Sequence, residues 1–180
     1  MVKLKNIALI SSLLFVLNSY SETLIQVDIS EQRLYLVSNN VVLSSYPISS
    51  SSYGEGQKEN SFKTPLGTHT IKEMIGSNAA KDTIFISRIN TKRAASLVKQ
   101  PIDTENDYVT SRIMWLEGDE EGFNKGGAVD SYKRYIYIHG TQEEGLIGVK
   151  ASHGCIRMFN NDVIELYKKV NIGTKVLIKA

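Results

Sequence analysis

The segments YIYIHGT (135–141) and SHGCIRM (152–158) organise this chain, because they contain its only cysteine and two of its three histidines. The first segment is an apolar run typical of a strand, and His139 stands at its end. Cys155 follows on a turn that Gly154 makes tight. A thiol becomes a useful nucleophile when a nearby imidazole takes its proton. The two segments therefore predict a cysteine–histidine site on a scaffold formed by the rest of the chain.

Two histidines compete for the role of base. His153 is two residues from Cys155, so the two side chains would share a face in an extended segment but not in a tight turn. His139 lies sixteen residues before the cysteine and can approach it across the fold. These positions favour His139 as the base, and they leave His153 as an open alternative. The third histidine, His69, is expected to be a half-buried strand residue.

Neighbouring residues suit the other roles that acyl transfer requires. Gly140 has no side chain to shield its carbonyl, which could accept a hydrogen bond from the imidazole. Gly154 would let a substrate approach the backbone N–H groups beside Cys155. Arg157 would lower the thiol pKa or bind a substrate carboxylate, and its alternative role is a surface salt bridge.

The composition is that of one globular domain, with 180 residues of which 42% are hydrophobic and 22% charged. Residues 1–21 have the three parts of a signal peptide: two lysines, an apolar run over 7–17 and small residues before a cut after Ser21. The apolar run is too short to span a bilayer, which needs about 20 residues. We therefore expect an exported protein, periplasmic or associated with the cell wall, whose single domain covers 22–180. Without the signal its basic and acidic residues balance, which argues against a nucleic-acid partner.

Many short apolar runs between polar turns predict a mainly β, sandwich-like fold with few helices. The Asn39–Asn40 pair suits a tight hairpin, and Thr64–Gly67 reads as a turn. A short helix is expected mid-chain and a longer one near the C-terminus, begun by Asn160 or Asn161. The expected strands are 24–29, 33–37, 41–43, 68–75, 83–89, 108–116 and 176–178, and the expected helices are 91–99 and 160–170.

The pattern of 138–141, a spacer and 152–158 resembles the signature of the L,D-transpeptidase catalytic domain family (YkuD-like). Thr64-Pro65-Leu66-Gly67 resembles the Thr-Pro-x-Gly turn upstream in that family, and the resemblance extends from about Leu24 to the C-terminus. It implies a mainly β fold and a cysteine acyltransferase that acts on peptidoglycan stem peptides without a metal or other cofactor.

By matching residues, the resemblance implies that Cys155 is the nucleophile and His139 the base, oriented by the Gly140 carbonyl. The residues implied to line the site are Ser152, His153, Gly154 and Arg157. The thiolate would attack the carbonyl between the L-centre of the third residue and the terminal D-alanine. An amine of another stem as acceptor gives a 3→3 cross-link, a lysine attaches a protein such as a lipoprotein, and water makes the enzyme a carboxypeptidase or endopeptidase.

Two other classes of function compete with acyl transfer. His139, His153 and Cys155 are three plausible zinc ligands, although Arg157 beside them disfavours a cation. A non-catalytic wall-binding module with a structural Cys155 is the other. The acidic loop 117–127 lacks the spacing of a calcium loop. The segments 49–60 and 76–107 exceed what a minimal domain needs, and we expect them to influence substrate choice.

Overall fold

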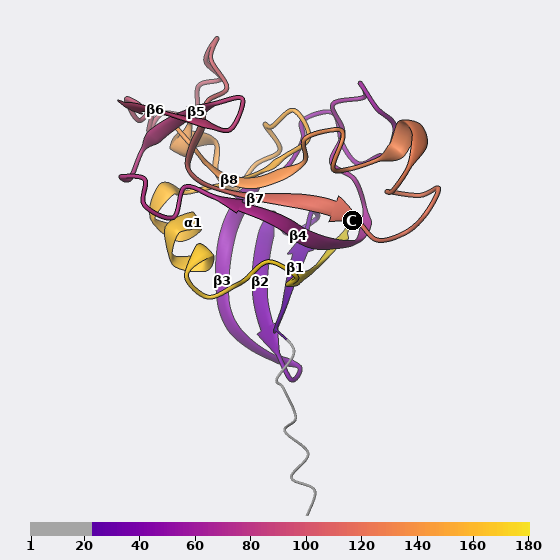
Figure 1. The fold of residues 1–180 in the computed structure, drawn as a ribbon. Helices are drawn as coiled ribbons and strands as arrows, with labels where there is room; N and C mark the ends of the chain where they lie inside the picture. The colour runs from indigo at the N-terminus through magenta and orange to yellow at the C-terminus, as the bar shows by residue number, and fades with distance from the viewer. Residues whose placement is uncertain (1–22) are drawn as a thin grey trace, which may run out of the picture.

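The computed structural model describes residues 23–180, so the predicted signal peptide lies outside the described residues. Ten strands form one continuous sheet with a main core and a smaller hydrophobic cluster, and one α-helix stands beside it (Figure 1). The elements are β1 Thr23–Asp28, β2 Arg33–Ser38, β3 Val41–Ser49, β4 Gly67–Ile75, β5 Thr83–Ile86, β6 Ile89–Ala94, β7 Val109–Gly118, β8 Tyr137–Thr141, β9 Ile156–Met158, α1 Asn160–Tyr167 and β10 Lys175–Lys179.

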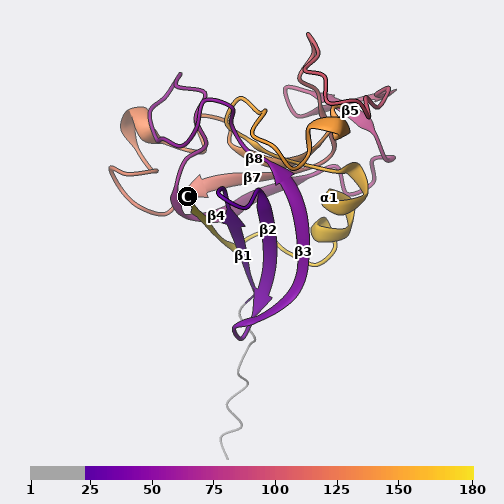
Figure 2. The same cartoon turned by 180° about the vertical axis from the view of Figure 1, so that it is seen from behind.

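The sheet closes on itself. Its order is β4-β10-β1-β2-β3-β9-β8-β7, and β7 also pairs with β4, so eight strands form a ring that β5 and β6 extend. Strands β1 to β3 cross behind β4, β7 and β8 in Figure 1, and Figure 2 shows them in front. The predicted mainly β fold is confirmed, and strand pairing at the edges joins the two layers of the expected sandwich into one closed sheet.

The first three strands form the predicted antiparallel meander. Asn39 and Asn40 connect β2 to β3 with φ angles of 49° and 62°, the left-handed conformation that asparagine tolerates in a tight hairpin. Residues 64–67, predicted as a turn, contain no hydrogen-bonded turn: Thr64 forms an isolated bridge with Glu55, and β4 begins at Gly67 with φ 93°.

The predicted helix over 91–99 is wrong. The chain instead turns at Ser87 and Arg88, and β6 runs back along β5 as the outer strand of the sheet. Thr91 Oγ1 donates to the Ile84 carbonyl oxygen, 2.8 Å away. A helix of nine residues is marginal without packing, and strand pairing with β5, whose Phe85 is buried, supplies backbone partners that the helix would lack. The strand predicted over 83–89 is for the same reason split between β5 and β6.

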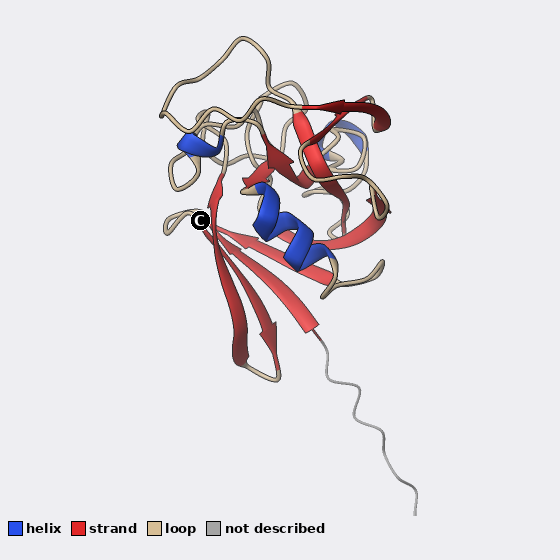
Figure 3. Cartoon of the chain, turned by 90° about the vertical axis from the view of Figure 1, so that its left-hand side faces the viewer, coloured by secondary structure: helices blue, strands red, loops and turns tan. Residues whose placement is uncertain are grey.

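The second helix is confirmed as α1, although it ends at Tyr167, before the predicted residue 170, and it packs beside β7 and β8. Figure 3 shows it in blue against the red strands. Val163 and Leu166 on its inner face belong to the main core. Asn160 is not its cap: Phe159 occupies that position without a side-chain hydrogen bond, and Asn160 is buried in the first turn. No helix in residues 23–180 has the length and apolarity needed to cross a membrane.

Candidate active site

Alternation along the central strands sorts core residues from site residues. On β8 and β9, Ile138 and Ile156 are partners and both lie in the main core. His139 pairs with Arg157, one position further along, so these two side chains point to the opposite face. Cys155 directly precedes β9 and shares that face by the same alternation. The parallel β8–β9 pair therefore brings Cys155 and His139 to one side of the sheet.

The thiol of Cys155 is hydrogen-bonded to the backbone at the start of β8 and just before it. Its sulfur accepts a hydrogen bond from Tyr137 N–H and donates one to the Tyr135 carbonyl oxygen, each at 3.3 Å. Burial raises the pKa of the thiol above its ordinary value, although Tyr137 N–H and the charges of Arg157 and Arg134 lower it. The resting group is thus a neutral thiol that needs a base.

His139 is oriented as such a base would be. Its ring is 2% exposed, and Nδ1 lies 2.7 Å from the Gly140 carbonyl oxygen. Since a carbonyl only accepts, Nδ1 carries the proton and Nε2 presents its lone pair. Burial lowers the pKa of His139, against the opposing effects of Asp107 and the Gly140 carbonyl, so the imidazole is neutral at pH 7. Among residues 23–180, Nε2 has no hydrogen-bond partner, and the thiol is bonded to backbone rather than to this ring.

Gly140 is required by the close approach of its neighbours. A Cβ at this position would lie 2.6 Å from Asn160 Oδ1 and 2.9 Å from the Thr110 carbonyl oxygen. Asn160 is held there by hydroxyl groups of Thr110 and Ser111, both at 2.6 Å. The first residue of α1 thereby supports the strand end that orients His139. We did not predict this role, because the position suggested only a helix cap.

The turn before Cys155 is closed by Ser152. Its hydroxyl donates to the Cys155 carbonyl oxygen at 2.6 Å and accepts from Gly154 N–H at 3.2 Å. Gly154 has φ 122°, a conformation that other residues rarely adopt. Ser152 is 1% exposed, and its backbone pairs with residues 50–52. Of the N–H groups beside Cys155 that we expected a substrate to approach, that of Gly154 is engaged by the Ser152 hydroxyl.

Arg157 is fully buried, so the alternative of a surface salt bridge is wrong. Its guanidinium lies 2.9 Å from a carboxylate oxygen of Glu143 and 2.6 Å from one of Asp107. Asp107 also lies 3.0 Å from His153 Nδ1. Burial raises the pKa of Asp107, but the charge of Arg157, His139 and the hydrogen bonds from Arg157 and His153 lower it by more, so the pKa is below its ordinary value. We did not predict the two acidic partners: Asp107 stood in an acidic loop and Glu143 in a spacer, without a pattern that points to the site.

His153 lies at the rim of a pocket of about 270 Å³ next to the turn. Its ring is 5.8 Å from that of Tyr53 and 6.1 Å from that of Phe62, both exposed aromatic residues that we did not single out from the sequence. The pocket is lined by Glu59, Asn60, Phe62, Lys133, Arg134, Tyr135, Ile136 and His153. It borders Tyr135, whose carbonyl accepts from the thiol.

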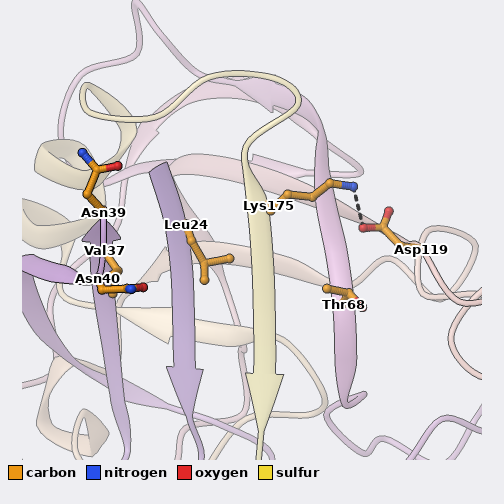
Figure 4. Close-up of a pocket in the computed structure, with 7 residues that line it drawn as sticks. All are labelled: Leu24, Val37, Asn39, Asn40, Thr68, Asp119 and Lys175. Carbon is orange, nitrogen blue, oxygen red and sulfur yellow. Dashed lines mark hydrogen bonds and ion pairs between the residues drawn. The ribbon is translucent and has the colours of Figure 1, made fainter. Parts of the chain in front are cut away.

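Neither the zinc alternative nor a second groove offers a competing site. Within residues 23–180, no three His, Cys, Asp or Glu side chains are arranged to hold a metal ion, so the zinc alternative from the sequence finds no ligand set. A groove of about 500 Å³ beside β1 and β10 contains the Lys175–Asp119 ion pair and asparagines, without a thiol or an imidazole (Figure 4).

The sequence and fold were compared with those of known proteins. The family model of the L,D-transpeptidase catalytic domain, YkuD, matches residues 22–178. The YkuD protein of Bacillus subtilis is 47% identical over 60 residues, which are 31% of this chain and 37% of that protein. The ErfK/SrfK protein of Salmonella typhimurium is 30% identical over 123 residues, 63% of this chain and 39% of that protein. The chain thus spans well under half the length of these relatives.

Solved structures agree in fold. The L,D-transpeptidase from Mycobacterium smegmatis aligns with a TM-score of 0.52 at 20% identity, over 89% of this chain and 59% of that one. The transpeptidase LdtMt1 in complex with imipenem aligns with a TM-score of 0.53 at 15% identity, over 88% of this chain and 59% of that one. The family match over nearly the whole chain shows that it belongs to the L,D-transpeptidase catalytic domain family.

Proposed function

We propose that this chain is an exported L,D-transpeptidase, a cysteine acyltransferase whose substrates are peptidoglycan stem peptides. The observation that carries the proposal is the arrangement of His139: Nδ1–H is fixed on the Gly140 carbonyl, Nε2 has no partner among residues 23–180, and the ring shares a sheet face with Cys155. Residues 22–180 would be the catalytic domain and 1–21 the export signal. Family membership and the exported-type N-terminal sequence support a site of action outside the cytoplasm, at the cell wall.

The first step would form a thioester at Cys155. The thiol leaves the Tyr135 carbonyl by rotation of its side chain, and His139 Nε2 takes its proton. The sulfur attacks the carbonyl carbon between the third residue and the terminal D-alanine. When the C–N bond breaks, the imidazolium returns the proton to the amine of the departing D-alanine.

The second step would transfer the acyl group. An acceptor amine attacks the thioester, His139 takes the proton of that amine, and the sulfur leaves and recovers a proton as thiol. An amine of a second stem gives a 3→3 cross-link, and a protein lysine gives an attached protein. With water in this step the same machinery acts as a carboxypeptidase.

Arg157 and its acidic partners would hold His139 and His153 in place beside Cys155. The pair of Arg157 and Glu143 is buried, and Asp107 connects it to His153 at the pocket rim. Ser152 and Gly154 would hold the turn that presents the thiol, and His153 would contact the substrate with Tyr53 and Phe62. A buried ion pair holds its groups in one geometry but leaves no free cation for a substrate.

Purified protein incubated with tetrapeptide muropeptides tests the proposal. We expect D-alanine release and a mass increase on Cys155 for the wild type, and neither for Cys155→Ala. Equal behaviour of the two proteins would overturn it. Runs with and without an added amine separate transfer from hydrolysis. Because a neighbour of the same fold is described in complex with imipenem, a carbapenem adduct confined to Cys155 is a second readout.

A further inference from the structure

The turn between β5 and β6 places a single arginine above the aromatic residues beside Cys155. Ser87 and Arg88 form this turn with φ angles of 48° and 69°. Positive φ at both residues is what a two-residue loop between antiparallel strands favours, so the hairpin geometry itself sets the direction in which Arg88 leaves the backbone. The hairpin extends the sheet beyond β7 and lies at the upper left of Figure 1.

The guanidinium of Arg88 is held by rings. Its carbon atom Cζ is 4.7 Å from the ring centre of Trp115 and 4.9 Å from that of Tyr135. One nitrogen donates to the Tyr137 hydroxyl at 3.1 Å. Among residues 23–180 no carboxylate lies within ion-pair distance of it. Since a guanidinium has five N–H donors, most of its capacity is unused.

The other two arginines around the thiol are engaged by oxygen atoms, although Nε and Nη2 of the buried Arg157 have no hydrogen-bond partner among residues 23–180 besides the ion pair of Nη2 with Asp107. Arg157 is ion-paired with Glu143 and Asp107. Arg134 donates to three backbone carbonyl oxygens, those of Gly56, Gln57 and Lys63. Among residues 23–180 Arg134, like Arg88, has no carboxylate within ion-pair distance, but carbonyl oxygens occupy its donors. Of the three arginines, Arg88 is therefore the one that combines an unpaired charge with mostly unused donors.

The residues that hold Arg88 also hold the nucleophile. Tyr137 binds Arg88 through its hydroxyl and the Cys155 sulfur through its N–H. Tyr135 lies under the guanidinium and accepts from the thiol through its carbonyl. Glu73, the acid whose charge raises the pKa of Arg88 after the Tyr137 hydrogen bond and the tyrosines, is itself bonded to the Tyr132 hydroxyl, and Tyr132 stacks on Trp115 at 4.1 Å. Within residues 23–180, the site thus has an oriented cation without an ion-pair partner, and Tyr137 contacts both this cation and the thiol.

We propose that Arg88 binds a carboxylate of the stem peptide whose scissile bond lies at Cys155, a substrate assignment that rests on the proposed function. A planar guanidinium matches a carboxylate with two parallel hydrogen bonds, and the rings on which it lies fix its plane beforehand. The carboxylate belongs either to the terminal D-alanine or to the side chain of the third residue. The hairpin of β5 and β6 is accordingly a specificity element rather than only an extension of the sheet.

Binding can be measured without catalysis in a Cys155→Ala background. The chain has one tryptophan, Trp115, so its fluorescence reports on ligands bound at Arg88. The probes are a tetrapeptide stem with free carboxylates, the same stem amidated at its C-terminus, and the same stem amidated at the third side chain. We expect Arg88→Gln to weaken binding of the free stem about 10-fold or more, the loss typical of a charge-assisted pair. Amidation of the recognised carboxylate should weaken binding to the Arg88 protein equally and leave binding to Arg88→Gln within about twofold.

Controls separate binding from folding and from the proposed function. Arg88→Lys keeps the charge and should retain part of the discrimination, and Arg93→Gln, on the exposed β6, should match the parent. Thermal melting establishes that each variant is folded. If Arg88→Gln weakens free and amidated stems alike, Arg88 only supports the hairpin and the inference is overturned. Discrimination without D-alanine release by the wild type would instead overturn the transpeptidase proposal and leave carboxylate binding in place.

Discussion

His69 and His139 are both buried on central strands, yet their ring nitrogens are used differently. His69, on β4, is 0% exposed, with Nδ1 3.0 Å from the Gly67 carbonyl oxygen and Nε2 3.0 Å from Ser131 Oγ. His139, on β8, has the same kind of carbonyl bond at Nδ1 but no partner at Nε2 within residues 23–180. Both rings are neutral, because burial lowers the pKa of each.

The difference shows that burial and neutrality alone do not make a base. His69 has satisfied both nitrogens and is part of the packing between β4 and the loop that carries Ser131. His139 keeps one lone pair for a proton and shares a sheet face with Cys155. The expectation that His69 is a strand residue without a catalytic role agrees with these contacts, although the residue is fully rather than half buried.

The largest effect is expected from removing the unpartnered nitrogen. His139→Gln should lower the rate of thioester formation about 10²–10⁴-fold, the usual contribution of a general base, while the protein stays folded. The rate of carbapenem or muropeptide acylation, followed by mass, measures it. His69→Gln is the matched control, and its folded fraction should react at the wild-type rate. A comparable loss in both variants would contradict the distinction between the two histidines.

The second effect is a loss of stability in acid that depends on His69. Its pKa is lowered from 6.5 to about 4, chiefly by burial, so the unfolded chain binds the proton more tightly. The associated stability is present above pH 6.5 and is lost as pH falls from 6.5 to about 4. A shift of this size corresponds to roughly 3 kcal/mol of the free energy of unfolding.

Urea unfolding at several pH values between 7 and 4 measures this loss. His69→Gln should show a smaller decrease across the same window, because glutamine does not titrate. Parallel curves for the wild type and this variant would contradict the assignment.

A smaller effect should follow when His69 is made to resemble His139. Ser131→Ala removes the donor to Nε2 and leaves a buried nitrogen without a partner, which should cost about 1–2 kcal/mol of the free energy of unfolding. Acylation of Cys155 should be unchanged, since an unpartnered imidazole needs a thiol on its own face. Denaturation and acylation of the same preparation give both values, and a slower reaction would indicate that the two regions are coupled.

The smallest effect concerns the thiol itself. Burial raises the pKa of Cys155 above 9.0, so alkylation by iodoacetamide should increase with pH and have its midpoint above that value. His139→Gln should change this profile less than about threefold, because a neutral imidazole does not stabilise the thiolate. A midpoint below pH 7 that moves in His139→Gln would show a thiolate–imidazolium pair and would revise the role of His139 from base to counter-ion.

Local patterns predicted most of the fold. Alternation of apolar residues marked the meander and β7, asparagines with left-handed φ marked the first hairpin, and the apolar face of α1 marked the C-terminal helix. The prediction failed for 91–99, where helical and strand preferences are close and pairing with β5 decides between them. Closure of the sheet between β4 and β7 joins segments about forty residues apart, and no local signal indicates it.

For the site, the sequence determined the chemistry: one thiol, two histidines beside it and glycines where the backbone must approach closely. Tertiary structure decided the partners. It placed His139 and Arg157 opposite each other on parallel strands, buried the charge of Arg157 against Glu143 and Asp107, and brought Arg88 over Trp115. Residue type sets which reactions a side chain can perform. Strand register and burial set its neighbours and its pKa, and these depend on contacts between segments far apart in the chain.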